Sequence, residues 1–276
     1  MKEDLKRQIV ECVKKVKENN PVTPSITNFV TINFVANAQL AVGGSAAMVF
    51  LPKEGELISE VGEATYINVG TLIPSHKETM IGAGNFLKAK NIPWVVDPVA
   101  IGIGKTRSEI LESFKDNKPS IIRGNPSEIN ALAGLWNLEG GASKSNVRGV
   151  DSTDSVDSAK DAAISIAKHT GGAVAVSGEV DLVTDGKIII KSKGGSDFME
   201  KITGAGCALG GVMAVYLSQS SPLIGALTGT NAFNLAGKRA SEKVEGPGSF
   251  QVLFLDELYK LTPEEISNND FYVEEI

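Results

Sequence analysis

The stretch PWVVDP, residues 93–98, is a short run of β-branched residues that ends in Asp97-Pro98. A run of this length and composition is typical of a strand buried on both faces of a parallel sheet. The same pattern recurs in AAMVFL (46–51), YINVG (66–70), SIIRGN (120–125) and AVAVSG (173–178). Helical patterns separate these runs, at roughly 29–41, 75–90, 126–135 and 156–169. The alternation predicts an α/β fold: a doubly wound, mostly parallel central sheet flanked by helices on both faces.

The remaining segments fit this architecture. DLVTDGKIIIK (181–191) places Asp-Gly between two apolar runs, which predicts a β-hairpin. Helical patterns follow at 204–218 and 222–243, and the polar stretch 143–155 indicates a surface loop. Because the chain has no internal repeat and no low-complexity linker, we expect a single domain over residues 1–276.

The composition excludes several classes of protein. The chain has 27 Lys and Arg against 33 Asp and Glu, a net charge of −6, and no basic cluster, so a nucleic-acid partner is not expected. Cys12 and Cys207 are the two cysteines, too few for a disulfide framework or a Cys-rich metal site, and this fits a reducing cytoplasm. Residues 1–20 place apolar side chains among charges at helical spacing, which predicts an amphipathic surface helix and not a signal peptide. We therefore expect a cytoplasmic protein.

Two stretches, 19–52 and 202–237, contain no charged residue. A membrane span would need about 18–20 uninterrupted apolar residues, and Pro, Asn, Gln or Ser interrupts both stretches. We therefore expect no membrane partner, and instead burial against the protein's own sheet or against a second subunit. The Asn, Thr and Gly content of these stretches also indicates a site for an uncharged ligand.

Candidate functional residues follow the strands, because ligands bind beyond the carboxyl ends of the strands in such sheets. These residues are Met48, Asp97, Arg123 to Glu128, and Ser177-Gly178. Arg123 ends an apolar strand, where a charge is costly unless it is paired, and phosphate is the obvious partner. Asp97 and Glu128 add carboxylate oxygens, so the set indicates a Mg-nucleotide site. The alternatives are a turn at Asp97-Pro98 and helix capping by Asn125 and Glu128.

MEKITGAGCALGGVM, residues 199–213, adds a second feature suited to an anion. Gly204, Ala205 and Gly206 precede an apolar helical pattern, and backbone N–H groups at such a helix start bind anions. Cys207 is then either a small buried residue or a base. A helix N-terminus lowers thiol pKa values, and a thiolate at this position would accept the proton of a substrate alcohol as this alcohol attacks a phosphate. The residues alone therefore indicate a phosphotransferase.

Other nucleotide and hydrolase motifs are absent from the sequence. It contains no GxxxxGK[ST], and no GxGxxG opens a helix after the first strand, so neither a P-loop nor a Rossmann dinucleotide site is supported. His76 and His169 lie in helical patterns, and we interpret both as surface or capping residues. A Ser/His/Asp triad is therefore not expected.

Several blocks together resemble a known family. KITGAGCALGG (201–211) is similar to the signature of hydroxyethylthiazole kinases. Further blocks agree in order: ITNFVTINFVANAQLAVGGSAAM (26–48), INVGTL (67–72), VVDPV (95–99), RGNPSEI (123–129), SGEVD (177–181) and GPGSF (246–250). The resemblance spans nearly the whole chain. It implies a ribokinase-like fold and the ATP-dependent, Mg²⁺-dependent phosphorylation of 5-(2-hydroxyethyl)-4-methylthiazole, the thiazole salvage step of thiamine biosynthesis.

The resemblance also implies roles for individual residues. Gly204, Ala205 and Gly206 would form the anion hole, and Cys207 would take the position of the base, where many ribokinase-like relatives have Asp. The other implied site residues are Arg123, Ser177 and Thr203 for ATP, Asn28, Met48 and Gly204 for the thiazole, and Asp97 and Glu128 for Mg²⁺ through water. A homotrimer with sites between subunits is implied as well, which would give the stretch 19–52 its second partner.

Three positions depart from the family pattern. Ala100 stands where the family usually has glycine, the segment 44–47 stands where Ala-Ser-Pro is common, and Ser177 is often Thr in relatives. These departures concern the phosphate loop and the shape of the pocket. The alternatives are a ribokinase-like kinase for a pyrimidine or pyridoxal alcohol, a nucleotide-dependent dehydratase on the same fold, and a non-catalytic nucleotide sensor.

Overall fold

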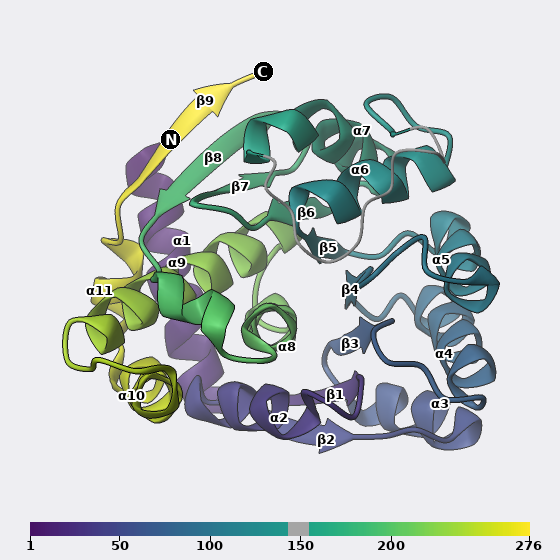
Figure 1. Cartoon of the computed structure of the whole chain (residues 1–276), viewed down its shortest axis with the longest axis horizontal. Coiled ribbons are helices and arrows are strands. Elements are labelled where there is room, and N and C mark those ends of the chain that lie inside the picture. Colours follow the sequence, from purple (N-terminus) through teal and green to yellow (C-terminus); the bar gives the residue numbers. More distant parts are fainter. Residues whose placement is uncertain (143–154) are drawn as a thin grey trace.

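A single mixed sheet forms the centre of the molecule (Figure 1). The computed structural model describes residues 1–142 and 155–276, so the loop expected at 143–155 lies outside the described residues except for Ser155. In the described ranges the sheet has nine strands in the order β2-β1-β3-β4-β5-β6-β7-β8-β9. They are β1 (Val22–Ile26), β2 (Ser45–Met48), β3 (Thr65–Asn68), β4 (Trp94–Asp97), β5 (Ile121–Gly124), β6 (Ala173–Val176), β7 (Val180–Thr184), β8 (Ile188–Lys193) and β9 (Phe271–Glu275). Neighbours from β2 to β6 pair in parallel, and the pairs from β6 to β9 are antiparallel, which confirms the mostly parallel sheet.

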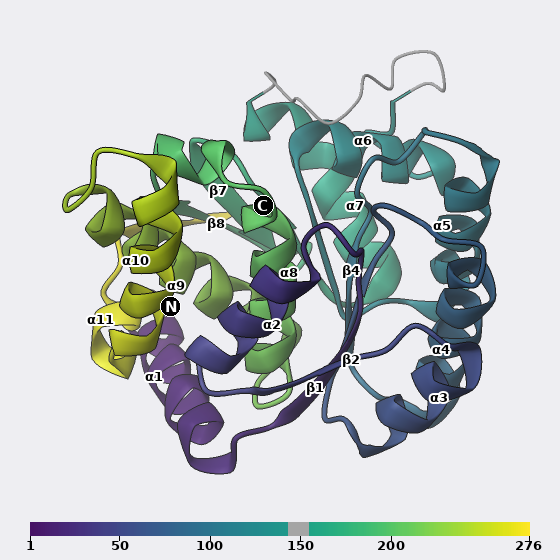
Figure 2. The same cartoon turned by 60° about the horizontal axis from the view of Figure 1, so that its bottom comes forward.

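Helices cover both faces of this sheet, as Figures 1 and 2 show. One face carries α1 (Lys2–Asn19), α2 (Ile32–Ala41), α8 (Ala205–Leu217), α9 (Pro222–Ser241), α10 (Pro247–Lys260) and α11 (Pro263–Ser267). The other face carries α3 (Pro52–Val61), α4 (His76–Lys90), α5 (Lys105–Asn117), α6 (Pro126–Leu135) and α7 (Lys160–Thr170). Short 3-10 turns, η1 (Val156–Ala159) and η2 (Asp197–Lys201), precede α7 and α8. The doubly wound α/β architecture is confirmed.

The interior residues of the central strands β3 to β6 are apolar because both faces of the sheet are covered there, and the polar residues of these strands lie at or next to the strand ends. Along β3, Tyr66 points into the core beneath α8 and Ile67 points into the core beneath α4 and α5. Val95 and Val96 of β4 divide in the same way, since successive side chains of a strand point to opposite faces. Burying one such side chain stabilises the fold by about 1.5–3 kcal/mol. This two-sided burial fixes which strand ends meet at the functional edge of the sheet.

Strand β1 did not stand out in the sequence because VTPSI is short, polar and contains proline. Its Thr23 and Ser25 are fully buried, and Gln39 of α2 satisfies their polar groups. The Gln39 amide nitrogen donates to the Thr23 carbonyl oxygen at 3.3 Å, and its amide oxygen accepts from the Ser25 hydroxyl at 3.2 Å. A tertiary contact therefore compensates a sequence that carries no strand pattern of its own.

The boundaries of other elements also differ from the prediction. The run predicted at 46–51 ends at Met48, and the chain turns into α3 at Pro52. Helices α3, α5, α10 and α11 and strand β9 were not predicted, although Pro52 and Pro247 at the first helical positions are start signals. The amphipathic first helix, the 181–191 hairpin and the helices at 204–218 and 222–243 are confirmed as α1, β7–β8, α8 and α9. None of the helices in the described ranges has the length and apolar character that crossing a bilayer requires.

Candidate active site

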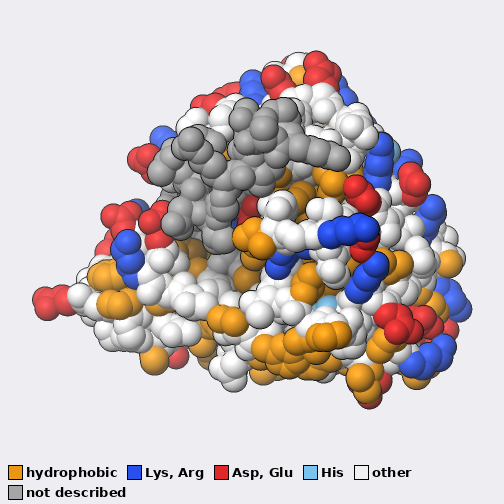
Figure 3. All heavy atoms as spheres, turned by 45° about the vertical axis from the view of Figure 1, so that its right-hand side comes forward, with side chains coloured by type: hydrophobic (Ala, Val, Ile, Leu, Met, Phe, Trp, Pro, Cys, Tyr) orange, Lys and Arg blue, Asp and Glu red, His pale blue; other side chains and the backbone are white. Residues whose placement is uncertain are grey.

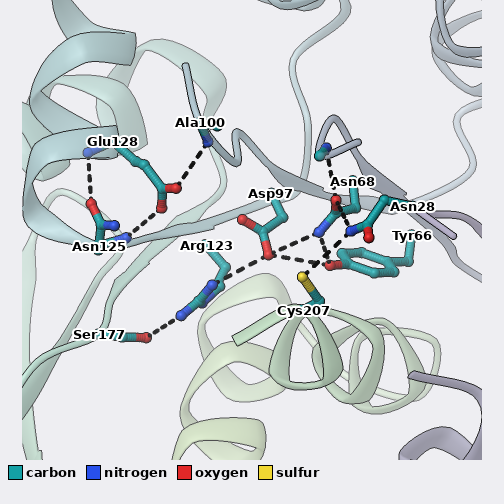
Figure 4. Close-up of polar contacts among 11 residues, drawn as sticks. Asn28, Tyr66, Asn68, Asp97, Ala100, Arg123, Asn125, Glu128, Ser177 and Cys207 are labelled. Atoms are coloured by element: carbon teal, nitrogen blue, oxygen red, sulfur yellow. Dashed lines mark hydrogen bonds and ion pairs between the residues drawn. The ribbon is translucent and has the colours of Figure 1, made fainter. Parts of the chain in front are cut away.

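The candidate site lies where the carboxyl ends of β3, β4 and β5 face the N-terminus of α8 (Figure 4). Asn68 and Asp97 are the last residues of neighbouring strands and are paired in register. Arg123 comes from the next strand, and Cys207 comes from the first turn of α8. The parallel topology thus gathers at one edge the residues that the sequence placed after separate strands.

Asp97 is a fully buried carboxylate whose two oxygens differ. Its Oδ2 accepts hydrogen bonds from the Tyr66 hydroxyl (3.2 Å) and the Asn68 amide (3.3 Å), and it pairs with Arg123 Nη1 (3.3 Å). Its Oδ1 is also buried and has no hydrogen-bond partner among the described residues. Burial raises the pKa of Asp97 to about 7, against the opposing effect of the Arg123 guanidinium. The free oxygen is therefore available to a ligand.

Arg123 links the end of β4 to the end of β6. Its Nη2 donates to the Ser177 hydroxyl at 3.0 Å, while Nη1 holds Asp97. Burial opposes the charge of Arg123, but the nearby carboxylates Asp97 and Glu128 raise its pKa above the ordinary value. The guanidinium also lies against Gly206: a methyl group at that position would be 2.5 Å from Nη1. A fixed cation is thus held at the N-terminus of α8.

The N-terminus of α8 has the form expected of an anion hole. Gly204 caps the helix with φ +95°, a conformation that favours glycine. The helix begins at Ala205, so the N–H groups of its first turn, including those of Gly206 and Cys207, have no partner within the helix. Thr203 precedes this turn and is exposed. These N–H groups, the helix dipole and Arg123 together favour a negatively charged group here.

Glu128 acts as a cap, as the alternative interpretation of the sequence proposed. Asn125 and Glu128 form a capping box at the start of α6: the Asn125 side chain accepts from the Glu128 N–H at 2.9 Å, and Glu128 Oε2 accepts from the Asn125 N–H at 2.9 Å. Glu128 Oε1 accepts from the N–H of Ala100 at 3.2 Å. Both carboxylate oxygens are therefore occupied by backbone donors, and a role of Glu128 toward a metal through water stays a prediction.

Ala100 explains one departure from the family pattern. Its φ is +58°, in the left-handed region that glycine adopts without strain. The family's usual glycine suits this conformation, whereas the alanine side chain makes it costly by about 1 kcal/mol. The loop nevertheless keeps the geometry that aims the Ala100 N–H at Glu128.

The Cys207 thiol is buried beside two asparagines. The Asn28 amide nitrogen donates to the sulfur at 3.7 Å and to the Asn68 amide oxygen at 3.0 Å. We expected the helix N-terminus to lower the thiol pKa, and this expectation is wrong for the free protein. Burial, and then the charge of Asp97, raise the pKa of Cys207 above its ordinary value, so both disfavour the thiolate.

Two of the three residues assigned to the thiazole, Asn28 and Met48, lie at the ends of the first two strands in the chain, and the third is Gly204 at the cap of α8. Asn28 follows β1, and half-buried Met48 ends β2, which pairs with β1 in parallel. Phe29, next to Asn28, stacks on Phe50 with ring centroids 4.4 Å apart, and both rings lie 5.9 Å from the ring of His76. His76 is fully buried and so is not a surface residue. At the first position of α4 its Nδ1 accepts from the Ile73 N–H at 3.3 Å, which agrees with the alternative of a capping residue. Burial lowers its pKa, which keeps this ring neutral.

Sequence reasoning missed Tyr66 and Asn68, which connect the two halves of the site. Asn68 donates to the Tyr66 hydroxyl at 2.8 Å and to Asp97, and it accepts from Asn28. Both residues are fully buried. The available signal was the position of Asn68 at the end of the run YIN, because the end of a neighbouring parallel strand lies beside Asp97.

Comparison with known proteins places this geometry in context. The model of the hydroxyethylthiazole kinase family matches residues 13–264. A hydroxyethylthiazole kinase of Bifidobacterium longum is 46% identical over 288 residues, covering 98% of this chain and 92% of the relative. A solved hydroxyethylthiazole kinase structure from Pyrococcus horikoshii OT3 has a TM-score of 0.85 and 30% identity, covering 98% of this chain and 99% of the other. A ribokinase-like superfamily protein from Enterococcus faecalis is similar in fold alone, with a TM-score of 0.59 and 15% identity over 88% of each chain.

Proposed function

Because the chain belongs to the hydroxyethylthiazole kinase family, we propose that it transfers the γ-phosphoryl group of ATP to the hydroxyl of 5-(2-hydroxyethyl)-4-methylthiazole. The chain is a kinase, and this reaction salvages the thiazole for thiamine biosynthesis. The observation that carries the proposal is the position of Arg123, which lies between Asp97 and Ser177 and against Gly206 at the start of α8. A cation and an anion hole at one point suit a transferring phosphoryl group.

The nucleotide is assigned to the side of Arg123 and Ser177, with Thr203 near its phosphates. Arg123 supplies charge-assisted hydrogen bonds to phosphate oxygens. Its Nε is buried and has no hydrogen-bond partner among the described residues, and the same holds for Asp97 Oδ1. Carboxylate oxygens with room for water are the donors that Mg²⁺ prefers, so Asp97 fits this ion and would hold it directly or through water. Mg²⁺ would supply charge neutralisation between the phosphates.

Phosphoryl transfer then requires the acceptor oxygen to be placed in line with the γ-phosphorus. The acceptor oxygen forms a bond to phosphorus as the bond from phosphorus to the bridging oxygen of ADP breaks. The proton of the acceptor hydroxyl passes to Cys207, which must be a thiolate to receive it. The N–H groups of Gly204, Ala205 and Gly206 stabilise the charge on the phosphoryl oxygens. Since burial raises the pKa of this thiol, we expect turnover to increase with pH.

The acceptor is assigned to the pocket of Asn28, Met48 and Gly204. Residues 19–52 contain no charge, which suits a small neutral heterocycle. The amide of Asn28 reaches the Cys207 sulfur, so an alcohol bound beside Asn28 lies next to the proposed base. This arrangement connects the acceptor side of the site to the phosphate side.

We also propose a cytoplasmic homotrimer whose sites lie between subunits. The charge-free stretch exposes several apolar side chains: Phe29, Val30, Leu40 and Leu51. Apolar side chains gather on the lower part of the surface in Figure 3, and β2 is an edge strand of the sheet. A second copy on this surface would cover these groups and close the pocket at Met48. Leu40→Glu should shift the sedimenting species from trimer to monomer and raise the acceptor KM; an unchanged trimer would contradict this assignment of the interface.

The deciding experiment for the activity is ADP release by the purified protein in MgATP, with and without hydroxyethylthiazole. Thiazole-dependent ADP release supports the proposal, and ³¹P NMR of the product should show a phosphate monoester. Hydroxymethylpyrimidine and pyridoxal are the control acceptors. Turnover with one of these alcohols and none with the thiazole would assign the chain a different substrate.

A further inference from the structure

Thr31 has a buried hydroxyl group without a hydrogen-bond partner in the part of the chain that the structure describes. It occupies the N-cap position of α2, where threonine commonly accepts a hydrogen bond from the first turn of the helix. Its side chain forms no such bond. The residue is 5% exposed, and its Oγ1 has no hydrogen-bond partner among the described residues. Because an unpaired buried hydroxyl is destabilising, this group has the properties of one that awaits a ligand.

The residues around Thr31 indicate which atom of a bound ligand its hydroxyl would contact. A methyl group at Gly204 would lie 2.9 Å from both Cβ and Cγ2 of Thr31, so the threonine packs directly on the cap of α8. The sulfur of Cys207 belongs to the first turn of this helix, three residues after the cap. Asn28, three residues earlier in the chain, approaches the same sulfur. Thr31 therefore lies beside the anion hole, the proposed base and the residues assigned to the acceptor.

We propose that the Thr31 hydroxyl binds the reacting hydroxyl group of the acceptor. The inference rests on the proposed kinase function and adds a residue to it. A threonine hydroxyl is one donor and can accept as well. Here it donates to the acceptor oxygen, while the acceptor O–H points to the Cys207 sulfur. This pair of hydrogen bonds orients an acceptor lone pair toward the phosphorus, which is the alignment that the transfer requires.

The chain offers a matched control for this group. Thr228 of α9 is also fully buried, and its Oγ1 likewise has no partner within the described residues. The core around α1, α8 and α9 also holds a cysteine, Cys12, whose pKa burial raises to about 11. Thr228 belongs to α9. It therefore shares the chemistry of Thr31 without the contact with Gly204.

The test compares Thr31→Val, Thr31→Ser and Thr228→Val. Valine keeps the shape of threonine and removes the hydroxyl, whereas serine keeps the hydroxyl. We expect Thr31→Val to lower kcat/KM for the acceptor about tenfold, the effect of one lost hydrogen bond. ADP affinity by calorimetry should be unchanged and Tm equal or higher, because an unsatisfied buried group is removed. Thr31→Ser should recover most of the activity, and Thr228→Val should match the wild type in kcat/KM.

Two results would overturn the inference. The first is a wild-type kcat/KM in Thr31→Val. The second is an equal loss of kcat/KM in Thr31→Val and Thr31→Ser together with a lowered Tm, which indicates a structural role. The wild-type rate with each alcohol tests the proposed function separately. If the wild type phosphorylates only a pyrimidine or pyridoxal alcohol, the proposed acceptor is wrong, and the same variant ratios with that alcohol still decide the role of Thr31. If no alcohol is phosphorylated, both proposals fail.

Discussion

Replacing Gly206 by alanine tests the contact between Arg123 and the start of α8. The new Cβ would lie 2.5 Å from Nη1, 2.7 Å from Nη2 and 2.9 Å from Cζ of Arg123, where ordinary contact begins at 3.4 Å. The guanidinium must therefore retreat by about 0.9 Å, the difference between 3.4 and 2.5 Å. The backbone of α8 cannot yield as easily, because the helix is buried along nearly all of its length.

The retreat breaks or lengthens the two interactions that hold the cation. These are the 3.3 Å pair with Asp97 and the 3.0 Å hydrogen bond to Ser177. Hydrogen bonds to charged groups contribute about 1.5–3 kcal/mol each, and the displaced Arg123 can rotate to recover part of this. We therefore expect Gly206→Ala to lower the free energy of unfolding by about 2 kcal/mol. ADP affinity should fall about tenfold or more, because Arg123 no longer faces the phosphates.

Urea unfolding measures the stability, and titration calorimetry with ADP measures the affinity. Gly248→Ala is the control, because a methyl group at Gly248 in α10 meets nothing within 4 Å. This control should bind ADP normally and be as stable as the wild type, or up to about 1 kcal/mol more stable through helix propensity. Wild-type ADP affinity in Gly206→Ala would refute the assignment of Arg123 to the nucleotide.

Four further changes test other parts of the structure. Cys207→Ala should lower kcat about 10²-fold or more and remove the increase in turnover with pH that the raised thiol pKa predicts. An unchanged pH profile would exclude the thiolate base. Asp97→Asn should raise the Mg²⁺ concentration needed for half-maximal ADP release, whereas an unchanged Mg²⁺ requirement would remove Asp97 from the metal site. Ala100→Gly should raise the free energy of unfolding by up to about 1 kcal/mol, because glycine adopts positive φ without strain, and urea unfolding measures this gain. Glu265 has its pKa lowered from 4.5 to about 2, first by its hydrogen bond with Arg239; its stabilisation is present above pH 4.5 and is lost as the pH falls toward 2. Because the pair is partly exposed, Glu265→Gln should lower the free energy of unfolding by about 1 kcal/mol or less at neutral pH. Near pH ~2 the variant and the wild type should be equally stable. A loss of stability that is the same at both pH values would contradict the ion pair.

The sequence predicts those parts of the fold whose residues carry their own pattern. β3 to β6 are recognisable because the interior residues of these strands, which are buried on both faces of the sheet, are apolar. β1 is not recognisable, because its buried Thr23 and Ser25 depend on Gln39, a residue of α2. Periodicity along the sequence carries no information on contacts between separate elements, so β1 can be identified only from the folded structure.

The candidate site also contains residues that the sequence identifies and residues that it does not. Asp97, Arg123 and Cys207 could be identified from their positions after strands or at a helix start. Asn68 was missed although its position at the end of a strand was a signal. Thr31 carried no such signal, because its role depends on the packing of α2 against α8. The pKa of Cys207 was mispredicted for a related reason: the helix N-terminus is a local property, whereas burial and proximity to Asp97 are tertiary ones.

The contact between Asn28 and Cys207 joins residues 179 positions apart. Closing so long a loop costs conformational entropy before any contact compensates it, and proteins rich in such distant contacts fold slowly. During synthesis the first two strands leave the ribosome long before the helix that carries the thiol. The completed pocket therefore exists only once the whole chain has folded. On dilution from denaturant, enzymatic activity would return only once α8 has brought Cys207 beside Asn28.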